Sequence, residues 1–384
     1  MSRSEHERAQ DPGDDPLLGE EEAQAAAEAV RSGWVAQGPR VAEFEKRFAA
    51  LVGAEHGVAV SSCTTGLHLA LIAAGVQAGD EVIVPSLSFI ATANAARYVG
   101  AVPVFADVEL ATGNLSVETT DAVRTGRTRA IVAVHQGGVP FDTRALRAAA
   151  AEWGIPLVED AACGAGSTAY GEPVGAGSLI SAWSFHPRKL ITTGEGGMVT
   201  VDDAEVAVRL RRLREHGMNV SAADRHASAQ PVLEAYLETA YNYRMTDIQA
   251  AVGLVQLGRL DGIVAQRRAI AQRYQELLAD IDGLVPVRDP AYGTTNYQSF
   301  WVLFEPSFGA TRDEALAELA ANGVSARRGI MASHLEPAYA GHPHVDLPNT
   351  ERITRGSLIL PVHHALTDDD QDHVVAVLRK LASR

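Results

Sequence analysis

The chain has 384 residues, of which 46% are hydrophobic, so it is long and apolar enough to form one large α/β domain and a smaller one. Its formal net charge of −15 argues against nucleic-acid binding, which needs a basic face, and it has no run of about eighteen apolar residues, the length that a membrane span needs. The two cysteines, Cys63 and Cys163, argue against a disulfide framework, and with no secretory signal recognised they favour a cytoplasmic protein.

The sequence begins with a polar stretch and then alternates between strand and helix patterns. Residues 1–15 are charged and polar with almost no apolar content, which predicts a disordered tail. Seven short apolar runs follow, with helical patterns such as Arg144–Trp153 between several of them. The predicted strands are Gly57–Ser62, Glu81–Pro85, Val102–Val108, Arg129–His135, Pro156–Glu159, Ser181–Phe185 and Gly197–Val201. This alternation predicts an α/β fold with a mainly parallel seven-stranded sheet and helices on both faces.

The C-terminal third has a different pattern. It is helical from about Thr246 to Asp280, where residues such as Ile248, Val252 and Val255 form an apolar stripe. Beyond it, the sequence predicts a strand at Gln298–Phe304, a helix at Arg312–Asn322, and a last helix capped by Thr367 with Asp370 three residues on. We therefore divide the chain into the tail 1–15, a large α/β domain over 16–250, and a long connecting helix with a small α+β domain over 251–384.

A turn rich in small residues follows the first predicted strand. Residues 57–66 are typical of a strand, a tight turn and the start of an amphipathic helix, and the turn carries the hydroxyls of Thr64 and Thr65. A helix N-terminus presents free N–H groups, so this turn suits an anion such as phosphate. Hydroxyls are common in turns, however, so the segment alone is not specific.

Two later segments supply a carboxylate and an amine. Asp160 lies at the carboxyl end of the strand Pro156–Glu159, where open α/β sheets bind their ligands. Lys189 lies in a polar turn between the strand Ser181–Phe185 and the glycine-rich Gly194–Gly197. Partial desolvation in such a turn would lower the pKa of the lysine and favour Schiff-base formation. Most lysines are instead solvated surface charges, so the turn alone does not establish this chemistry.

Together, the anion site, the carboxylate and the lysine match the needs of pyridoxal 5′-phosphate (PLP). The anion site anchors the phosphate, the carboxylate keeps the pyridine nitrogen protonated, and the lysine forms the internal aldimine. From about Gly33 to the last helix, the chain resembles the DegT/StrS-type sugar aminotransferases, a branch of the fold-type I PLP enzymes. The segments that carry this resemblance are Ser32–Pro39, Ser62–Leu71, Pro85–Asn94, Glu159–Ala162, Ser184–Lys189 with Gly194–Gly197, and Tyr241–Asp247.

The resemblance implies a role for each residue that matches a family motif. Lys189 ends the Ser-Phe-x-x-x-Lys motif and is expected to form the internal aldimine, then to move the proton between substrate and cofactor. Asp160 is expected to hold the pyridinium nitrogen. Thr64, Thr65 and Ser184 are expected to bind the phosphate.

Three further positions are expected at the cofactor. Phe89 matches an aromatic residue that stacks on the cofactor ring, although core packing is the usual fate of phenylalanine. Cys163 departs from the family pattern, in which Gln or His is frequent, and a thiol is only a weak donor, so its role stays open. Asn242, in a Tyr-Asn-Tyr-Arg segment, is expected to reach the phosphate of the neighbouring subunit. That role implies a homodimer with shared active sites.

The resemblance places the remaining candidates on the substrate side. Trp34, Gln37 and Gly38 are expected to line it, Arg244 to help beside Asn242, and His334 to approach from the small domain. The remaining histidines show no spacing typical of a metal site, so we expect no metal.

The resemblance implies an enzyme of sugar or antibiotic biosynthesis that moves an amino group from an amino acid, glutamate or glutamine, to a keto sugar that is nucleotide-linked. A keto-cyclitol is an alternative acceptor. Other PLP chemistries, as in a dehydratase, a lyase or a desulfurase, are also alternatives. A dehydratase of this family would carry histidine in place of Lys189, so Lys189 argues against it. A desulfurase needs a mobile catalytic cysteine, whereas both cysteines here lie in predicted cofactor turns. A catalytically silent relative that senses a sugar or the cofactor is a further alternative, which Lys189, Asp160 and Asn242 argue against.

Overall fold

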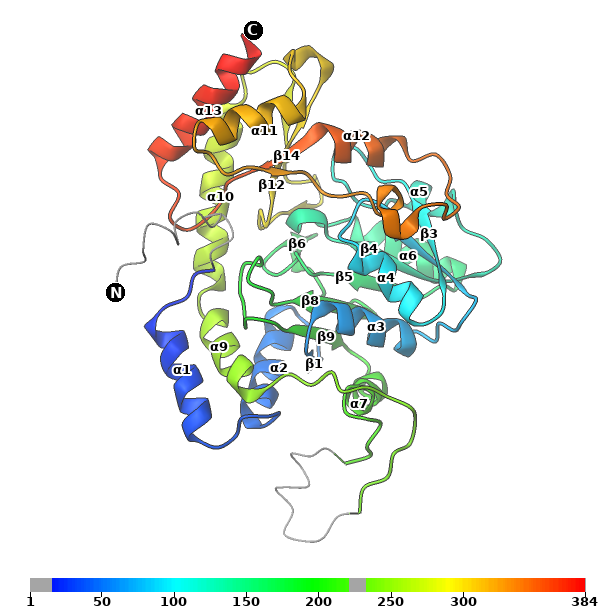
Figure 1. Ribbon diagram of the computed structural model, residues 1–384. Helices are drawn as coiled ribbons and strands as arrows, with labels where there is room; N and C mark the ends of the chain where they lie inside the picture. Colours follow the sequence, from blue (N-terminus) through cyan, green and yellow to red (C-terminus); the bar gives the residue numbers. More distant parts are fainter. Residues whose placement is uncertain (1–15, 221–232, 384) are drawn as a thin grey trace.

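The computed structural model describes residues 16–220 and 233–383, and the predicted tail over residues 1–15 lies outside this part of the chain. A seven-stranded sheet forms the centre of the large domain (Figure 1), with the strand order β1-β9-β8-β5-β4-β2-β3. Its strands are β1 (His56–Val60), β2 (Glu81–Pro85), β3 (Val102–Ala106), β4 (Thr128–Val134), β5 (Leu157–Asp160), β8 (Ile180–Ser184) and β9 (Gly197–Val201).

The sheet confirms the fold class predicted from the sequence. Strands β3, β2, β4, β5 and β8 pair in parallel, whereas β9 is antiparallel to both of its neighbours, β8 and β1. All seven predicted strands are present, and their ends differ from the prediction by at most two residues. Because β1 runs in the same direction as β8, the carboxyl ends of six strands meet at one edge of the sheet.

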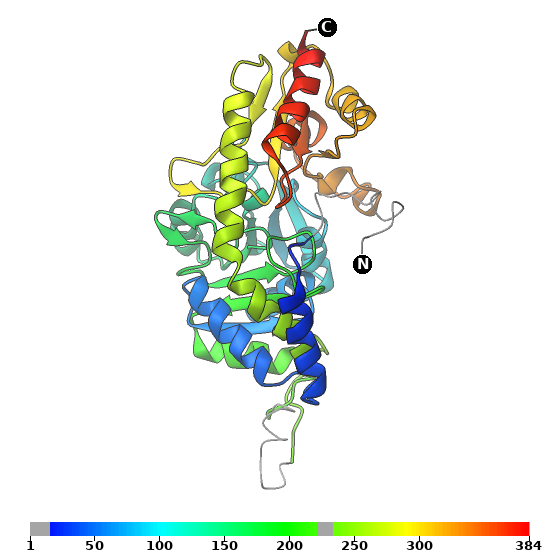
Figure 2. The same ribbon diagram turned by 90° about the vertical axis from the view of Figure 1, so that its left-hand side faces the viewer.

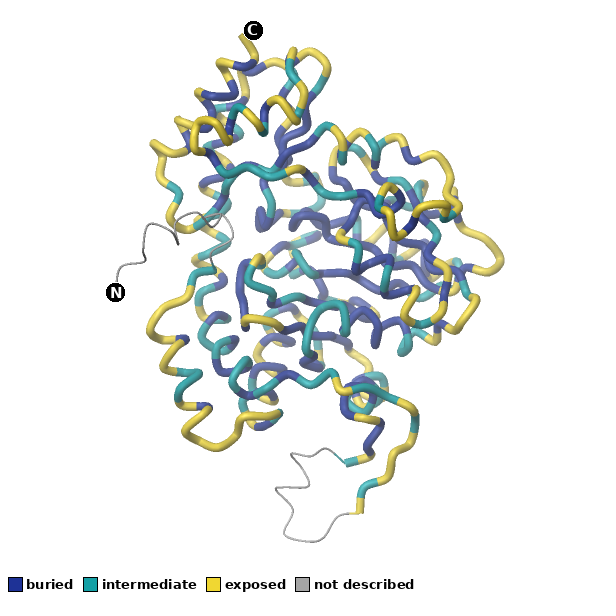
Figure 3. Tube along the Cα trace, viewed as in Figure 1, coloured by how far each residue is buried: buried dark blue, intermediate teal, exposed yellow. Residues whose placement is uncertain are grey.

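Helices cover both faces of the sheet, so each strand has an apolar residue on either side. On one face, Val58 and Val60 of β1 pack with α3 (Cys63–Ala73), α4 (Ala91–Tyr98) and α7 (Ala204–Leu213). On the other, Ala59 packs with α2 (Pro39–Leu51) and α9 (Asp247–Leu257). Leu157 of β5 packs there with α6 (Thr143–Trp153). Figure 3 shows the strands as the most continuously buried part of the molecule.

The connection to the small domain is a bent pair of helices. The helix α9 packs on α1 (Glu20–Arg31) and α2, and α10 (Leu260–Leu277) then runs alongside the small domain (Figure 2). The two axes differ by 57°. The predicted domain boundary at residue 250 falls inside α9, so the change of direction comes several residues later. No single described helix is long and apolar enough to cross a membrane, and only the bent pair meets that test of length and composition.

The small domain is built on an antiparallel sheet with the order β10-β12-β14-β13. The capping of the last helix by Thr367 and Asp370 is confirmed. The small-domain elements are β10 (Leu284–Pro286), β12 (Phe300–Phe304), α11 (Arg312–Ala321), β13 (Arg327–Arg328), α12 (Pro348–Gly356), β14 (Ser357–Leu360) and α13 (Asp368–Ala382).

Several short elements were not predicted from the sequence. A small sheet joins β11 (Gly293–Thr294), β6 (Thr168–Ala169) and β7 (Glu172–Pro173). The remaining elements of the described residues are the short helix α5 (Val117–Asp121) and four 3-10 turns: Gln136–Gly138, Pro306–Phe308, Ser333–Leu335 and Pro337–Tyr339. The last two turns return from the small domain to pack on the large one, where Tyr339 joins the core around Phe105.

Candidate functional site

The site lies at the sheet edge where the parallel strands end. Asp160 is the last residue of β5 and Ser184 the last of β8, and the N-terminus of α3 follows β1 at the same edge. The ends of β8, β9 and β1 lie side by side, because Ser184 pairs with Gly197 and Gly197 pairs with Val60. This edge is where a doubly wound sheet places its ligands.

The N-terminus of α3 forms a small anion site. Ser62 caps the helix by accepting a hydrogen bond from the Thr65 amide at 3.2 Å, and the Thr65 hydroxyl donates to the Ser62 carbonyl oxygen at 2.8 Å. The Thr65 hydroxyl is therefore already used in this capping box, and it would have to give up that hydrogen bond to bind phosphate as expected. Among the described residues, the Thr64 hydroxyl and the amides of Cys63 and Thr64 have no partner, so they are the groups that suit an anion.

Gly197 allows the strand β9 to lie directly against this turn. A Cβ at this position would stand 2.5 Å from the Ser62 carbonyl carbon and 2.6 Å from the Cys63 amide nitrogen. Any side chain here would therefore push β9 away from the first turn of α3. The glycine-rich segment that the sequence singled out thus shapes the anion site.

Asp160 is held at the bottom of the site by three donors. Its carboxylate accepts hydrogen bonds from the Thr92 hydroxyl at 2.7 Å and from the Ala162 amide at 3.2 Å, and the Cys63 thiol lies 4.0 Å from it. Burial raises the pKa of Asp160 above its ordinary value, although Thr92, Ala162 and the charge of Lys189 act in the opposite direction. A buried carboxylate of this kind is stabilised when a cation binds next to it.

Thr92 is a site residue that the sequence analysis did not single out. It lies in the first turn of α4, and its hydroxyl also shares a hydrogen bond of 2.8 Å with Ser88. Thr92 falls within Pro85–Asn94, one of the segments that carry the family resemblance. Ser88 and Thr92 thus form a short relay that ends on the Asp160 carboxylate.

Lys189 reaches the same edge from the turn after β8. Its Nζ donates to the Cys163 sulfur at 3.1 Å. Burial lowers the pKa of Lys189, but its contact with Cys163 and the nearby Asp160 carboxylate act in the opposite direction, and the pKa lies above its ordinary value. The expectation of a lowered pKa is therefore wrong for the protein without cofactor, because the acidic neighbours stabilise the ammonium more than burial penalises it.

Cys163 thus contacts Lys189 directly. Its position after Asp160, Ala161 and Ala162 brings the sulfur across the site to the amine. Cys63 is different: burial and the nearby Asp160 raise the pKa of its thiol, so it stays protonated. The two cysteines are both free and both at the site, as their place in the two turns predicted.

A second carboxylate lies beneath the first. Glu159 is buried and accepts hydrogen bonds from Arg147 at 2.7 Å and from His135 at 3.1 Å. Burial raises the pKa of Glu159, but these two partners outweigh it and hold the pKa below its ordinary value. His135 also packs on Phe141 with ring centroids 4.5 Å apart. This network fixes the end of β5 and hence Asp160.

Phe89 and Ser184 lie at the open side of the site. Phe89 is 68% exposed, so the core-packing alternative is wrong, and an aromatic ring in this position is available for stacking on a ligand. Ser184 is half-buried, and its hydroxyl accepts a 3.4 Å hydrogen bond from the His186 amide. Their contacts with the cofactor stay predictions.

Residues 34–38 and 241–247 lie together beyond β1, at the edge of the sheet. Trp34 is 39% exposed, and the Gln37 amide donates to Glu215 at 3.4 Å. A Cβ on Gly38 would stand 2.8 Å from the carboxylate of Asp247, so this glycine allows Asp247 to cap α2.

Asn242 is exposed in this same group. It accepts a 3.0 Å hydrogen bond from Arg244, which is also paired with Glu215 at 3.4 Å. Arg244 forms an antiparallel bridge with Val60, so this segment continues the sheet beyond β1. The structure therefore places Asn242 and Arg244 at the outer side of the edge, away from the end of β5.

His334 does not lie on an open substrate face. It is buried at 7% exposure, and its Nδ1 shares a 2.7 Å hydrogen bond with the Ser86 hydroxyl. Burial, followed by the charge of His344, lowers the pKa of His334. The ring anchors the returning segment of the small domain on the end of β2, which the local sequence could not indicate.

Two residues from the small-domain side tie the site loops together. The Asn296 amide donates to the carbonyl oxygens of Cys163 and Ala165, both at 2.7 Å. The Gln298 amide donates to the Arg188 carbonyl oxygen at 2.6 Å, directly before Lys189. The sequence analysis identified neither residue, because both bonds join positions more than 100 residues apart.

The residues present fit PLP. The helix N-terminus with Thr64 suits the phosphate, the buried Asp160 suits a protonated ring nitrogen, and Lys189 provides the amine. When bound, PLP supplies a ring that accepts electrons from the substrate carbon bearing the nitrogen.

Comparison with known proteins agrees with this fit. Residues 16–379 match the DegT/DnrJ/EryC1/StrS aminotransferase family. The chain belongs to this family.

Individual members of the DegT/DnrJ/EryC1/StrS family are similar over almost their whole length. The spore coat polysaccharide biosynthesis protein SpsC of Bacillus subtilis is 39% identical, with 95% of each chain covered. The solved aminotransferase TlmJ of Streptoalloteichus hindustanus is 37% identical with a TM-score of 0.88, covering 96% of this chain and 98% of TlmJ. DesI, solved in the presence of its TDP-sugar product, is 35% identical with a TM-score of 0.87, covering 97% and 93%.

Solved members of the DegT/DnrJ/EryC1/StrS family include PLP and pyridoxamine-phosphate forms. The protein is thus a PLP-dependent aminotransferase of a sugar aminotransferase family. Its own residues supply the buried carboxylate, the amine and the anion site that such an enzyme needs.

Proposed function

We propose that this protein transfers an amino group from glutamate or glutamine to a nucleotide-linked keto sugar, with Lys189 covalently holding the cofactor between turnovers. The observation that carries this proposal is the convergence of Lys189, Asp160 and the N-terminus of α3 on one sheet edge. Support for the sugar comes from the polysaccharide biosynthesis role in the name of SpsC and from the TDP-sugar product of DesI.

In this proposal Lys189 has two tasks. It releases the cofactor when the amino donor binds, and its free amine then moves a proton between the substrate carbon and the cofactor. Cys163, 3.1 Å from Nζ, holds the amine in place before the cofactor binds. Asp160 stays ionised next to the ring nitrogen, since a cation there offsets the cost of its burial.

We also propose a cytoplasmic homodimer with shared sites. The extended sheet has four neighbouring segments at this edge: β8, β9, β1 and residues 241–247. Each of them contributes one residue of a continuous row, which runs Ser184, Gly197, Val60, Arg244. Three interstrand steps of about 4.8 Å place Arg244 roughly 14 Å from Ser184. Asn242, two residues earlier, is exposed, so its side chain is accessible to a partner subunit.

An exposed apolar group adds support for a partner. The described ends of the segment between α7 and α9 project from the large domain (Figure 1). They carry Leu233 at 92% exposure, Tyr236 at 63% and Leu237 at 56%. Neighbouring apolar side chains with this exposure are typical of an interface.

A panel of acceptors tests the proposed function. The enzyme is first converted to the pyridoxamine form with glutamate or glutamine, and each keto compound is then scored by the return of the PLP absorbance. The panel contains nucleotide-linked keto sugars, the same sugars without nucleotide, and keto-cyclitols. Rapid return with a nucleotide-linked sugar alone supports the proposal, whereas preference for a free sugar or a cyclitol refutes the assigned acceptor.

A further inference from the structure

The contact between Cys163 and Lys189 brings a thiol and an amine together. The Lys189 Nζ donates to the Cys163 sulfur at 3.1 Å. Both side chains are half-buried, so the pair is partly exposed to solvent and to small solutes. Separations of about 3–3.5 Å are typical of atoms that are placed to form a bond. The pair is therefore arranged for a reaction between sulfur and nitrogen.

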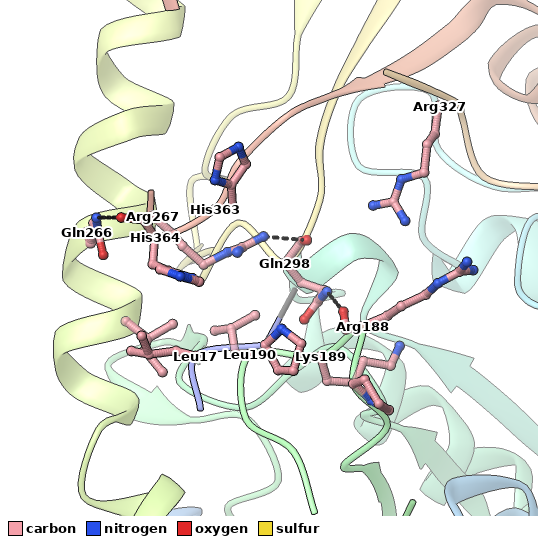
Figure 4. Close-up of a pocket in the computed structure, with 13 residues that line it drawn as sticks. Leu17, Arg188, Lys189, Leu190, Gln266, Arg267, Gln298, Arg327, His363 and His364 are labelled. Carbon is pink, nitrogen blue, oxygen red and sulfur yellow. Dashed lines mark hydrogen bonds between the residues drawn. The ribbon is translucent and has the colours of Figure 1, made fainter. Parts of the chain in front are cut away.

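One short segment of the chain holds both members of the pair. The Asn296 side chain donates to the Cys163 carbonyl oxygen at 2.7 Å. The Gln298 side chain donates to the Arg188 carbonyl oxygen at 2.6 Å, one residue before Lys189, in what we call the lysine turn (Figure 4). Asn296 also accepts from the Gln298 backbone amide at 2.7 Å. Because these anchors are two positions apart and bonded to each other, the sulfur and the amine are kept in contact.

The second cysteine provides a comparison within the same site. The Cys63 thiol faces the Asp160 carboxylate at 4.0 Å, and burial, followed by the charge of Asp160, raises the pKa of this thiol. A thiol that stays protonated is a poor nucleophile, whereas reactive cysteines have electropositive and partly exposed surroundings. Cys163 has such a neighbour in Lys189. Oxidation is therefore expected first at Cys163.

We propose that Cys163 is an oxidation site, at which hydrogen peroxide links its sulfur to the Lys189 nitrogen while no cofactor is attached there. In the first step the thiol gives two electrons to the peroxide. The O–O bond breaks, an S–O bond forms, and water leaves, so that Cys163 becomes a sulfenic acid. In the second step the Lys189 ammonium loses a proton to solvent and its nitrogen attacks the sulfur. The S–O bond breaks, an S–N bond forms, and the hydroxyl leaves as water with a second proton from the nitrogen.

The product of these two steps is a sulfenamide, which thiols reverse. A thiol attacks the Cys163 sulfur and displaces the Lys189 nitrogen as a free amine, and a second thiol then releases Cys163 while the reductant becomes a disulfide. The linkage also prevents further oxidation of Cys163 to the sulfinic acid, which thiols do not reverse. While it lasts, Lys189 has no amine for the cofactor. The oxidised protein should therefore fail to give the PLP absorbance until it has been reduced.

PLP is expected to prevent the linkage, and this part of the inference rests on the proposed attachment of the cofactor to Lys189. A nitrogen that is already bonded to the cofactor does not attack the sulfur. At a PLP concentration about 100-fold above its dissociation constant, only about 1% of the chains have a free Lys189, so linkage is expected to be about 100-fold slower. The linkage in the protein without PLP does not depend on that attachment.

Peptide mapping of the full chain tests the proposal. The protein, with and without PLP, is treated with hydrogen peroxide in mildly alkaline buffer, its free thiols are blocked, and it is unfolded and digested with trypsin. Cleavage after Arg188 separates the two residues, because Cys163 falls in the peptide 148–188 and a linked Lys189 begins the peptide 189–209. Without PLP we expect these two peptides to be joined, with two hydrogen atoms fewer than their sum, and to be released by dithiothreitol.

Three variants locate the linkage. Cys163→Ser is expected to give no joined peptides, and Cys63→Ser is expected to give as much of them as wild type. In Lys189→Ala the sulfenic acid has no amine to react with, so dimedone, a reagent for sulfenic acids, should label Cys163 more than in wild type. Circular dichroism and thermal unfolding show whether each variant folds, and the mapping of wild type remains a test without them.

Other products of the same digestion would overturn the proposal. The peptide 148–188 joined to the peptide 48–97, which contains Cys63, would mean a disulfide instead. Cys163 found unmodified, or only as its sulfinic acid, would mean that the amine does not capture the sulfur. A joined pair heavier by one oxygen atom would overturn the sulfenamide, because oxygen would then lie between sulfur and nitrogen. If the linkage forms but PLP gives no protection, the proposed attachment to Lys189 fails and the oxidation site stands.

Discussion

The Thr92→Val substitution tests whether the hydroxyl above Asp160 sets the charge of that carboxylate. Valine has nearly the shape of threonine but has no hydroxyl, so the 2.7 Å hydrogen bond to Asp160 is lost and the packing of α4 is kept. Burial already raises the pKa of Asp160, and Thr92 is the strongest influence that opposes it. Without Thr92 the pKa of Asp160 rises further.

The size of the effect follows from the bond that is removed. A hydrogen bond to a charged group contributes about 1.5–3 kcal/mol. Each 1.36 kcal/mol changes a proton-binding equilibrium tenfold, so the proton affinity of Asp160 increases about 10- to 100-fold. Ionised Asp160 is the form that pairs with a protonated ring nitrogen, so cofactor binding is lost at a higher pH than in wild type.

The assay is the dissociation constant of PLP measured from acid to neutral pH by absorbance. We expect the acid limb of the binding profile of Thr92→Val to move to higher pH. Thr120→Val is a matched control, because Thr120 is also buried and its hydroxyl donates to the Ser116 carbonyl oxygen at 2.7 Å, far from the site. The reasoning is refuted if the acid limbs of Thr92→Val and Thr120→Val coincide.

Four other perturbations test separate parts of the structure. Gly197→Ala is expected to destabilise the fold by about 1–3 kcal/mol and to weaken PLP binding, because the new Cβ meets the first turn of α3; thermal unfolding and cofactor titration measure both. Arg147→Met is expected to cost about 3 kcal/mol at neutral pH, since buried Glu159 loses a partner. The pKa of Glu159 is held low in the folded state, so its stabilisation is present above its ordinary pKa and is lost as the pH falls; the deficit of the Arg147 variant should therefore shrink in acid, as seen by denaturant unfolding. Borohydride reduction and peptide mapping should find a pyridoxyl group on Lys189. Mixed subunits carrying Lys189→Ala and Asn242→Ala should regain activity, because one shared site of the heterodimer is intact.

Each of these predictions has a clear contrary result. Gly262→Ala, where a Cβ meets no atom within 4 Å, is the control for Gly197→Ala, and equal losses in both would contradict the role of the close contact. A stability deficit of Arg147→Met that is independent of pH would mean that Glu159 is not the group involved. A pyridoxyl label on another lysine would refute the assignment of Lys189, and mixed subunits as inactive as their parents would refute shared sites.

The sheet and the positions of Asp160 and Lys189 at its edge could be predicted because their signals are local. The seven strands are short apolar runs. Asp160 is the last residue of one of them, and Lys189 lies in the turn that follows another. The contacts that define the chemistry are not local. Thr92 lies 68 positions before Asp160, and Cys163 lies 26 positions before the lysine that it contacts.

The wrong expectations have the same origin. The pKa of Lys189 was expected to be lowered because its turn directly follows an apolar strand, whereas the acidic groups that reverse the shift come from other loops. The resemblance implied a place on the substrate side for His334, but the side chain is buried and its partner Ser86 lies 248 positions earlier. The sequence alone therefore does not reveal which polar side chains contact each other across the sheet edge; the structure does.

The bonds made by Asn296 and Gln298 have a consequence for how the enzyme matures. Gln298 fastens the lysine turn from 110 positions further along the chain, and Asn296 fastens the loop after Asp160 in the same way. During synthesis the large domain emerges from the ribosome first, so these two loops of the candidate site exist for some time without these restraints. Contacts of such long range also form late in folding. Cofactor capture is therefore expected to be a late event, and a nascent chain that ends before Asn296 should not retain PLP.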